Sequence, residues 1–263
     1  MIVIIALETV FNIAPCSFRS KDPIHFAMIK TVTQEDAWKG EENCSVCSIR
    51  DSVLFAGLKE NDFGLIHKPI EQLPLQHGDI LYHAGDKADK LFTIRHGLVK
   101  LVQYLPDGNQ RIVRLLRDTD VTGMEALLGD EYHHDAIVMQ TTEVCVLPIE
   151  VVQRLSKENA DLHHELMKRW QRALTDADLW ITQLSTGSAR QRVARLLIKL
   201  VCDEDQRCEL FNREDMGAIL GITTETASRT VADFKRKGLL KELKPNLYVA
   251  DTDKLQEVAE DLL

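Results

Sequence analysis

The sequence predicts an α+β protein in three parts: an antiparallel β-sandwich or barrel, which the resemblance given below specifies as a β-roll of the jelly-roll type, a long helix, and a C-terminal winged helix-turn-helix. Short apolar runs separated by glycine turns across residues 71–149 predict the sandwich or barrel. Apolar side chains spaced like the seam of a coiled coil predict the long helix. Gly221, between two amphipathic segments, predicts the turn of the third part.

The composition is that of an ordinary folded chain, but its charge is unevenly distributed. The 263 residues are 44% hydrophobic and 28% charged, with a net charge of −9. This acidity argues against a nucleic-acid surface over the whole protein. Residues 188–250 carry 12 Lys or Arg against 9 Asp or Glu, a local charge of +3. The charge is therefore compatible with a DNA-binding C-terminal end.

The N-terminal apolar run of residues 1–7 ends at Glu8, so it is too short to span a bilayer and lacks the basic flank of a signal peptide. We therefore expect a cytoplasmic protein with no membrane segment. In that compartment its six cysteines are reduced thiols, metal ligands or redox sensors. Met28 begins a more polar segment, so residues 1–27 are interpreted as a disordered tail or an overlong start.

Apolar runs and turn signals place the elements in order. Residues 54–70 have the pattern of a short amphipathic helix. Further helices are predicted around residues 193–200 and 252–263, and a hairpin wing around Pro245-Asn246. The strands of the roll are predicted at Ile80–Tyr82, Leu91–Ile94, Leu98–Tyr104, Ile112–Leu116, Ile137–Met139 and Val144–Leu147.

The long helix is predicted from about Asn159 to Leu184, a length of roughly 39 Å at about 1.5 Å per residue. An apolar stripe along a helix of this length must be covered by a partner. The partner is either the protein's own β-sandwich or a second copy of the chain in a parallel homodimer. A dimer would supply two recognition helices for a two-fold operator. The predicted seam consists of Leu166, Trp170, Ala173, Ala177, Trp180 and Leu184.

The helix-turn-helix is predicted over residues 213–240. Gly221 ends its first helix, and Thr223 or Thr224 caps the second. Glu225, Ser228 and Arg229 then lie on one face, where they suit the reading of base edges in a major groove. The alternative is a surface helix whose polar side is merely solvated. The opposite, packing face consists of Met216, Ile219, Leu220, Ile222, Ala227, Val231 and Phe234.

Several motifs stand in a shared order along the chain. They are Gly78-Asp79-Ile80-Leu81, Ala84-Gly85-Asp86, Gly123-Met124-Glu125-Ala126-Leu127, Ser188-Ala189-Arg190-Gln191-Arg192 and Glu225-Thr226-Ala227-Ser228-Arg229. This order resembles the CRP/FNR superfamily of bacterial transcription regulators, and the Glu-x-x-Ser-Arg pattern is similar to its FNR-like branch. The resemblance implies an N-terminal arm (1–43), a cyclic-nucleotide-binding-like β-roll sensor (44–158), a dimerisation helix (159–186) and a winged helix-turn-helix (187–263).

The same resemblance implies what the protein binds. Its partners would be double-stranded DNA, RNA polymerase and a second copy of the chain. The expected half-site is of the TTGAT type, with Glu225 and Arg229 on the G·C pair and Ser228 on a neighbouring thymine. Thr223 and Thr224 complete the expected DNA-binding set. In the FNR-like branch a carboxylate on the dimerisation helix opposes association, and Asp176 is the matching residue in this chain.

The resemblance argues against cyclic AMP as the effector. The cyclic-AMP-binding branch pairs a Glu after the glycine with a later Arg-Ser, which together hold the cyclic phosphate. Here Met124 follows Gly123, and His134 and Asp135 stand at the Arg-Ser positions. An aspartate there would repel the phosphate.

The cysteines suggest an iron–sulfur sensor instead. Cys44, Cys47 and Cys145 resemble ligands of the oxygen-labile [4Fe–4S] cluster of the FNR-like branch. The third N-terminal cysteine of that pattern is missing, because Val53 and Phe55 stand near its expected place. Cys16 is the candidate for the fourth ligand.

Other interpretations of these cysteines stay open. Cys145 alone fits a buried small hydrophobe, and a C-x-x-C pair also occurs in zinc and redox sites. Haem, thiol redox or a small ligand are the alternative effectors. Cys202 and Cys208 are expected to be core or surface thiols. His133-His134 is either a haem or metal pair or, as we favour, part of a solvated hairpin.

Two other classes of protein fit the sequence less well. A cupin-like metalloenzyme would need clustered His and Glu ligands in the strands, and the sequence contains no such set, so no enzyme activity is predicted. A β-roll signalling dimer without DNA binding would not need Glu225, Ser228 and Arg229 on one face. The sequence therefore favours a DNA-binding regulator.

Overall fold

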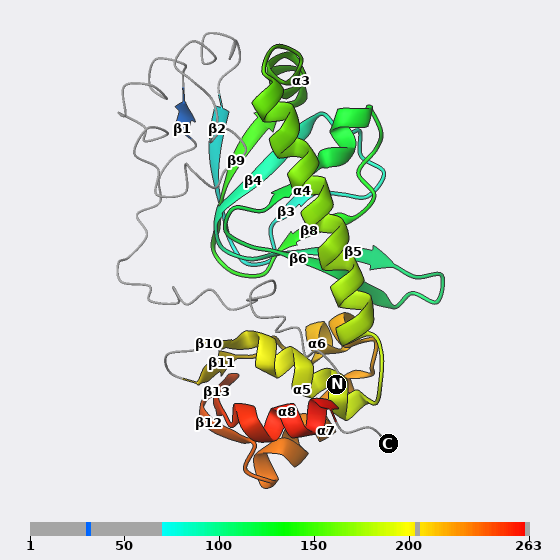
Figure 1. Cartoon of the computed structure of the whole chain (residues 1–263), viewed down its shortest axis with the longest axis vertical. Helices are drawn as coiled ribbons and strands as arrows, with labels where there is room; N and C mark the ends of the chain where they lie inside the picture. The colour runs from blue at the N-terminus through cyan, green and yellow to red at the C-terminus, as the bar shows by residue number, and fades with distance from the viewer. Residues whose placement is uncertain (1–29, 33–69, 203–205, 261–263) are drawn as a thin grey trace, which may run out of the picture. The chain divides into compact units, whose positions relative to one another are not determined.

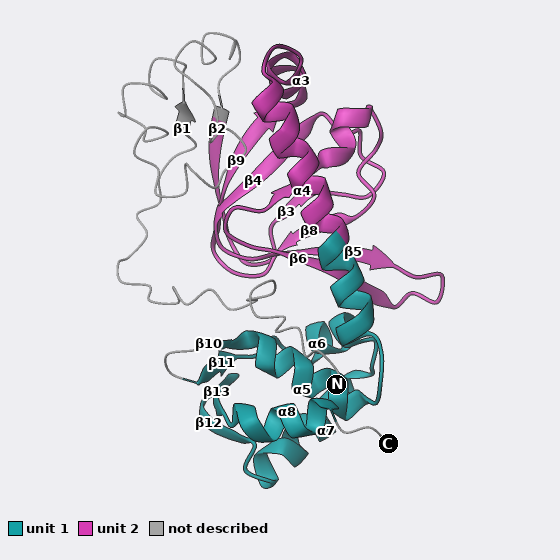
Figure 2. Ribbon diagram, viewed as in Figure 1, with its two compact units in different colours: residues 1–20, 175–263 teal, residues 21–174 magenta. Residues whose placement is uncertain are grey.

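The computed structural model describes residues 30–32, 70–202 and 206–260. Two compact units divide the chain between Leu174 and Thr175, within a helix (Figure 2). The first unit contains the β-roll, and the second contains the C-terminal helices and a small sheet. The predicted α+β architecture is confirmed, and each unit is described by itself below.

The β-roll consists of two antiparallel sheets (Figure 1). One has the strand order β1-β2-β9-β4-β7, and the other has the order β3-β8-β5-β6. The strands of the first sheet are β1 (Lys30–Val32), β2 (Ile70–Leu75), β9 (Thr142–Pro148), β4 (Lys90–His96) and β7 (Val121–Thr122). Those of the second are β3 (Ile80–Tyr82), β8 (Asp135–Val138), β5 (Val99–Tyr104) and β6 (Gln110–Leu116).

All six predicted strands of the roll are present, and each end lies within two residues of its expected position. The sequence did not predict β2, because Pro74 within it removes a backbone donor and usually marks a break. Pro74 is tolerated because it lies beyond Ile70–Gln72, the part of β2 that pairs with β1. The amphipathic helix predicted over residues 54–70 lies outside the described residues, except that Ile70 begins β2.

The core of the roll is filled by side chains from both sheets and from the helices that follow. Tyr82 stacks on Tyr132 with ring centroids 3.9 Å apart, and the Tyr82 hydroxyl is hydrogen-bonded to that of Thr122. Burial raises the pKa of Tyr82. A short helix η2 (Met124–Leu128) begins at Gly123, whose φ of 79° and close approach to the Lys90 carbonyl both require glycine.

Two helices follow the roll, α3 (Ile149–Glu158) and α4 (Ala160–Leu179), and α4 continues into a π-helical turn η3 (Trp180–Leu184). Asn159 separates α3 from α4, and its side chain accepts a hydrogen bond from the Leu162 amide at 3.1 Å. The start predicted for the long helix is thereby confirmed. On α4, Arg169 donates to the Thr119 carbonyl at 2.6 Å, which ties the β6–β7 turn to the helix.

The C-terminal unit surrounds α5 (Ala189–Leu200), which a Ser188–Gln191 capping box begins. It contains α6 (Arg213–Leu220), α7 (Thr224–Arg236), α8 (Thr252–Glu260) and the sheet β10-β11-β13-β12. Its strands are β10 (Val201–Cys202), β11 (Arg207–Glu209), β12 (Leu240–Lys244) and β13 (Leu247–Ala250). The predicted wing, β12–β13, is confirmed; β10 and β11 are too short to give a sequence signal.

Candidate nucleic-acid interface

The turn between α6 and α7 forms as the sequence predicts. Gly221 has φ 63° and ψ 44°, the left-handed conformation that ends α6. Thr223 caps α7, because its hydroxyl accepts a hydrogen bond from the Thr226 amide at 3.2 Å. A Cβ on Gly217 would lie 2.7 Å from the Ile222 carbonyl oxygen, so this close approach of α6 to the turn also requires glycine.

The two faces of α7 separate as predicted. Ala227, Val231 and Phe234 are buried with Met216, Ile219 and Leu220 of α6, while Ile222 is half-buried. The five predicted DNA-binding residues lie on the other side of the helix, and all five are exposed to solvent: Thr223, Thr224, Glu225, Ser228 and Arg229. The packing face therefore fixes α7 in the unit and leaves the polar face of its first two turns accessible.

The polar face carries both signs of charge. The pKa of Glu225 lies below its usual value because its carboxylate accepts from its own backbone amide and from the Thr223 hydroxyl, with the Arg229 charge as a smaller cause. Glu225 is therefore ionised near neutral pH and acts only as an acceptor. Arg229 provides the matching donor fork one turn later. An acceptor and a donor at this spacing suit the two bases of one G·C pair.

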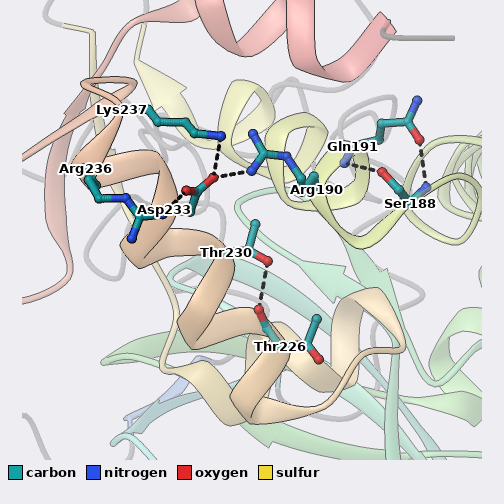
Figure 3. A network of polar contacts seen from close by, with 8 residues as sticks. All are labelled: Ser188, Arg190, Gln191, Thr226, Thr230, Asp233, Arg236 and Lys237. Carbon is teal, nitrogen blue, oxygen red and sulfur yellow. Dashed lines mark hydrogen bonds and ion pairs between the residues drawn. The ribbon is translucent and has the colours of Figure 1, made fainter. Parts of the chain in front are cut away.

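The C-terminal end of α7 is tied to α5 through Asp233 (Figure 3). The Asp233 carboxylate pairs with Arg190 of α5 and with Arg236 and Lys237 at the end of α7. These cations, Arg190 first, lower the pKa of Asp233 to about 2. The Arg190 guanidinium also lies 5.2 Å from the centre of the Phe234 ring. The sequence did not reveal this network, because its two helices are joined only in the folded unit.

The wing is connected to α7 by a second set of contacts. Lys235 pairs with Glu242 of β12, and the Tyr248 hydroxyl donates to Glu242 at 3.4 Å. Arg213, at the start of α6, donates to the Tyr248 hydroxyl oxygen at 3.0 Å. Lys241 and Lys244 on the wing are exposed. The wing therefore carries two exposed cations that were not predicted, and the charge pattern of residues 241–244 is the sequence signal for them.

The exposed apolar residues of the long helix differ from those of the predicted seam. Leu166, Trp180 and Leu184 are buried within the chain, so for these three residues the partner is the protein's own fold and not a second copy. Ala173 is partly buried against the core of the roll. The exposed apolar residues are Met167 (43% exposed), Trp170 (37%), Leu174 (59%) and Ile181 (60%). We call these four residues the exposed stripe.

The exposed stripe has a coiled-coil spacing of its own. Compared with the predicted seam, Met167, Leu174 and Ile181 each lie one position further along the helix, while Trp170 is common to both. Ala177, which is half-buried, continues the same 3-4 spacing. Asp176 is two positions beyond Leu174, or about 200° around a helix, and therefore lies off the stripe. The cross-seam repulsion predicted for Asp176 consequently has no support from its position.

In the sensor unit the structure describes one predicted cluster ligand, Cys145. It lies on β9 opposite Thr93 of β4 and Gln72 of β2. Among the described residues, the buried Thr93 hydroxyl has no hydrogen-bond partner. Opposite residues of antiparallel strands point to the same face, so an unsatisfied donor lies beside the cysteine. A thiolate ligand at Cys145 would supply an acceptor, and this part of the site fits a sulfur-bound metal group.

The remaining predicted ligands, Cys16, Cys44 and Cys47, lie outside the described residues. Within the described parts of the chain, no three His, Cys, Asp or Glu side chains are grouped so as to hold a metal ion. His133 is exposed and lies 3.1 Å from Asp130, whereas His134 is half-buried, so only the first histidine of the pair is solvated as predicted. Cys208 is buried, which raises the pKa of its thiol to about 12.

The residues at the predicted phosphate site do not fit a cyclic nucleotide. Met124 is buried in the core of the roll. The Asp135 carboxylate accepts a hydrogen bond from the Ala84 amide at 2.8 Å and lies 3.6 Å from a nitrogen of His83. Burial lowers the pKa of His134, which disfavours its cationic form. The Asp135 carboxylate therefore occupies the Ala84 amide as an acceptor, whereas a bound cyclic phosphate would need free donors and positive charge at this site.

Comparisons with known proteins agree with this architecture. Residues 72–159 match the profile of the cyclic nucleotide-binding domain, and residues 191–258 match that of the Crp-like helix-turn-helix domain. The fumarate and nitrate reduction regulatory protein of Vibrio cholerae is 28% identical over 82% of this chain and 90% of its own length. The transcriptional activator protein anr of Pseudomonas aeruginosa is 25% identical over 83% of this chain and 93% of its own.

Solved structures show the same fold. A CRP-family transcriptional regulator of Thermus thermophilus has a TM-score of 0.64 at 25% identity, over 73% of this chain and 98% of that one. FixK2 of Bradyrhizobium japonicum has a TM-score of 0.66 at 20% identity, over 74% of this chain and 99% of that one. A nucleotide-binding-type β-roll, a long helix and a helix-turn-helix with an exposed polar face define a DNA-binding transcription regulator, not an enzyme. The chain belongs to the CRP/FNR family of transcription regulators.

No helix within the described residues is long and apolar enough to cross a membrane.

Proposed function

We propose that the protein is a cytoplasmic homodimer that binds a TTGAT-like palindrome and acts with RNA polymerase. The single observation that carries the DNA specificity is the exposed face of α7, where Glu225, Ser228 and Arg229 project beyond a capped N-terminus. Arg229 would donate to the guanine and Glu225 accept from the paired cytosine, with Ser228 on a neighbouring thymine. Thr224 and the helix N-terminus would contact phosphates.

The proposed dimer is formed through the exposed stripe. Leaving Met167, Trp170 and Leu174 in water is unfavourable, and their 3-4 spacing suits a parallel pair of helices. A two-fold axis along this stripe would place one α7 on each half of a palindrome. Glutamate substitution in the stripe should therefore weaken both dimerisation and DNA binding.

We also propose that the signal reaches the protein as oxygen or redox state through a [4Fe–4S] cluster. Cys44, Cys47 and Cys145 would be its thiolate ligands, with Cys16 as the candidate for the fourth. When bound, the group would supply an oxygen-sensitive centre beside β9. The support is the unsatisfied Thr93 hydroxyl beside Cys145, together with the relatives found.

DNA recognition is tested by gel shift on a TTGAT palindrome at several salt concentrations. A specific complex should weaken log-linearly with salt. Arg229→Ala should lose about 1–3 kcal/mol and lose its discrimination at the G·C pair. Lys254→Ala, an exposed cation on α8, is the matched control and should bind like the wild type. Equal binding of palindrome and scrambled DNA by the wild type would reject the proposed specificity and favour a signalling β-roll dimer.

The cluster is tested by anaerobic purification, absorption spectroscopy and iron and sulfide analysis. Iron and sulfide in equal amounts, with loss of colour in air, would support the proposal. A colourless, metal-free protein would reject it and leave thiol redox or a small ligand as the signal, whereas a haem spectrum would identify haem. The DNA test uses the same anaerobically purified protein, so that loss of a cluster in air is not mistaken for lack of DNA specificity.

A further inference from the structure

Arg195 on α5 joins three segments of the C-terminal unit that are far apart in the sequence. Its Nη1 donates to the Gln183 carbonyl at 3.2 Å and to the Thr186 carbonyl at 3.0 Å. Its Nη2 donates to the Ala259 carbonyl at 3.0 Å. Gln183 lies in η3, Thr186 in the turn that follows, and Ala259 in the last turn of α8.

The chemistry of these contacts explains why the residue is an arginine. The last carbonyls of a helix lack intrahelical partners and form the negative end of the helix dipole. Arg195 places one positive charge at two such ends, those of η3 and α8. The planar guanidinium has five donors in a fork and reaches three carbonyls at once. A lysine ammonium is a single point and does not span the same set.

The surrounding turn is built tightly around this contact. Gly187 has φ 85°, and a Cβ there would lie 2.7 Å from the Gln191 side-chain oxygen and 3.5 Å from Nη1 of Arg195. Gln191 belongs to the capping box that begins α5. Trp180 and Leu184 of η3 are buried, and α5 packs against both η3 and α8. The end of the long helix is therefore held to α5 by apolar packing and by Arg195.

We propose that Arg195 is a positioning residue that sets the angle between the end of the long helix and the helix-turn-helix, and thereby the operator half-site spacing. The inference rests on the proposed dimer. Ile181 of the exposed stripe is two residues before Gln183, so the contacts of Arg195 begin where the proposed dimer interface ends. In a two-fold complex, a fixed angle at this point fixes the separation of the two α7 helices.

The test compares full-length wild type with Arg195→Met, which keeps an unbranched stem but has no donors, and with Arg195→Lys. Lys254→Met is the matched control, because Lys254 is an exposed cation of α8 that pairs with Asp251. Binding is measured by fluorescence anisotropy on TTGAT palindromes whose half-site spacing changes by one or two base pairs. Hydrogen exchange is followed by mass spectrometry over residues 180–188.

We expect the wild type to prefer one spacing by about tenfold or more over its neighbours, and Arg195→Met to reduce that preference below about threefold. Binding of a single half-site should change by less than about twofold, and Arg195→Lys should be intermediate. Exchange over residues 180–188 should become at least about fivefold faster in Arg195→Met. Lys254→Met should keep both the spacing preference and the exchange rate of this segment.

An unchanged spacing profile in Arg195→Met would overturn the specificity role, and unchanged exchange over 180–188 would overturn the positioning contact itself. If Arg195→Met does not fold, Arg195→Lys tests both the spacing preference and the exchange rate. A wild-type spacing preference and a wild-type exchange rate in Arg195→Lys would show that a guanidinium bound to three carbonyls is not needed. Failure of the proposed function is recognised separately. A wild type that binds no TTGAT palindrome at any spacing would reject the dimeric reader, while the exchange experiment would still test the contact.

Discussion

The Arg192 guanidinium on α5 donates a 2.6 Å hydrogen bond to the carbonyl oxygen of Leu220, the last residue of α6. A second, longer contact of 3.5 Å reaches the Gly221 carbonyl. These carbonyls belong to the tight turn before the recognition helix α7. A side chain outside the helix-turn-helix therefore satisfies the acceptors of its turn.

Removing this contact should destabilise the C-terminal unit. Arg192→Met leaves the Leu220 carbonyl without its charged donor, and we expect a loss of about 1–3 kcal/mol in the free energy of unfolding. Arg192→Lys should lose less, because it keeps a charged donor. Urea unfolding followed by circular dichroism measures the difference, with the exposed Lys241→Met as control. Equal stability of Arg192→Met and wild type would show that the contact contributes nothing.

Substitutions on the long helix should separate the exposed stripe from the buried side. Leu174→Glu places a charge in the proposed interface, so the dimer dissociation constant should rise by at least about tenfold. Leu166→Ala should instead lower the free energy of unfolding by about 2–5 kcal/mol, because Leu166 is 5% exposed. Sedimentation velocity and urea unfolding distinguish these effects, with the exposed Gln171→Glu as control. A fully dimeric Leu174→Glu would contradict the proposed interface.

Acid should weaken the C-terminal unit through Asp233. Folding lowers the pKa of Asp233 from its ordinary 3.8 to about 2, chiefly through Arg190. The stabilisation is therefore complete above pH 3.8 and is lost as the pH falls towards 2. Asp233→Asn should show a smaller loss of stability over this interval than the wild type, measured by urea unfolding at each pH. The exposed Asp253→Asn is the control, and identical pH profiles for wild type and Asp233→Asn would refute the assignment.

Loss of the described cysteine ligand should abolish the proposed cluster. Cys145→Ser removes a thiolate, and the iron bound after anaerobic reconstitution should fall by at least about tenfold. Cys208→Ser is the control, because Cys208 lies on β11 in the other unit. Iron and sulfide analysis and the absorption spectrum give the measurement. Full cluster occupancy in Cys145→Ser would remove Cys145 from the ligand set.

Replacing Thr93 should stabilise the metal-free protein but destabilise a bound cluster. Thr93→Val removes a buried hydroxyl without a partner among the described residues, so the metal-free protein should be more stable by about 1–2 kcal/mol. If a cluster-bound Cys145 sulfur accepts from this hydroxyl, the cluster of the variant should decay faster in air. Thermal unfolding of the metal-free protein and decay of the visible absorption test the two parts. An unchanged decay rate would separate Thr93 from the cluster.

The sequence by itself determined the local elements of the helix-turn-helix. Gly221 ends α6 because only glycine enters the left-handed region freely, and Thr223 caps α7 because its hydroxyl reaches an amide three residues on. Glu225, Ser228 and Arg229 share a face for the same reason of local helical geometry. Such features depend on residues close together in the chain, so pattern and spacing suffice to predict them.

Only the tertiary structure decided which apolar face of the long helix stays exposed. The spacing of apolar residues predicted Leu166 and not Met167 as a seam residue, but packing buries Leu166 and leaves Met167 in solvent. The contacts of Arg195 with Gln183 and Ala259, and of Arg190 with Asp233, join residues from separate elements in the same way. Periodicity states that a helix has an apolar side, whereas burial depends on which distant elements fold against it, and a single sequence does not record that choice.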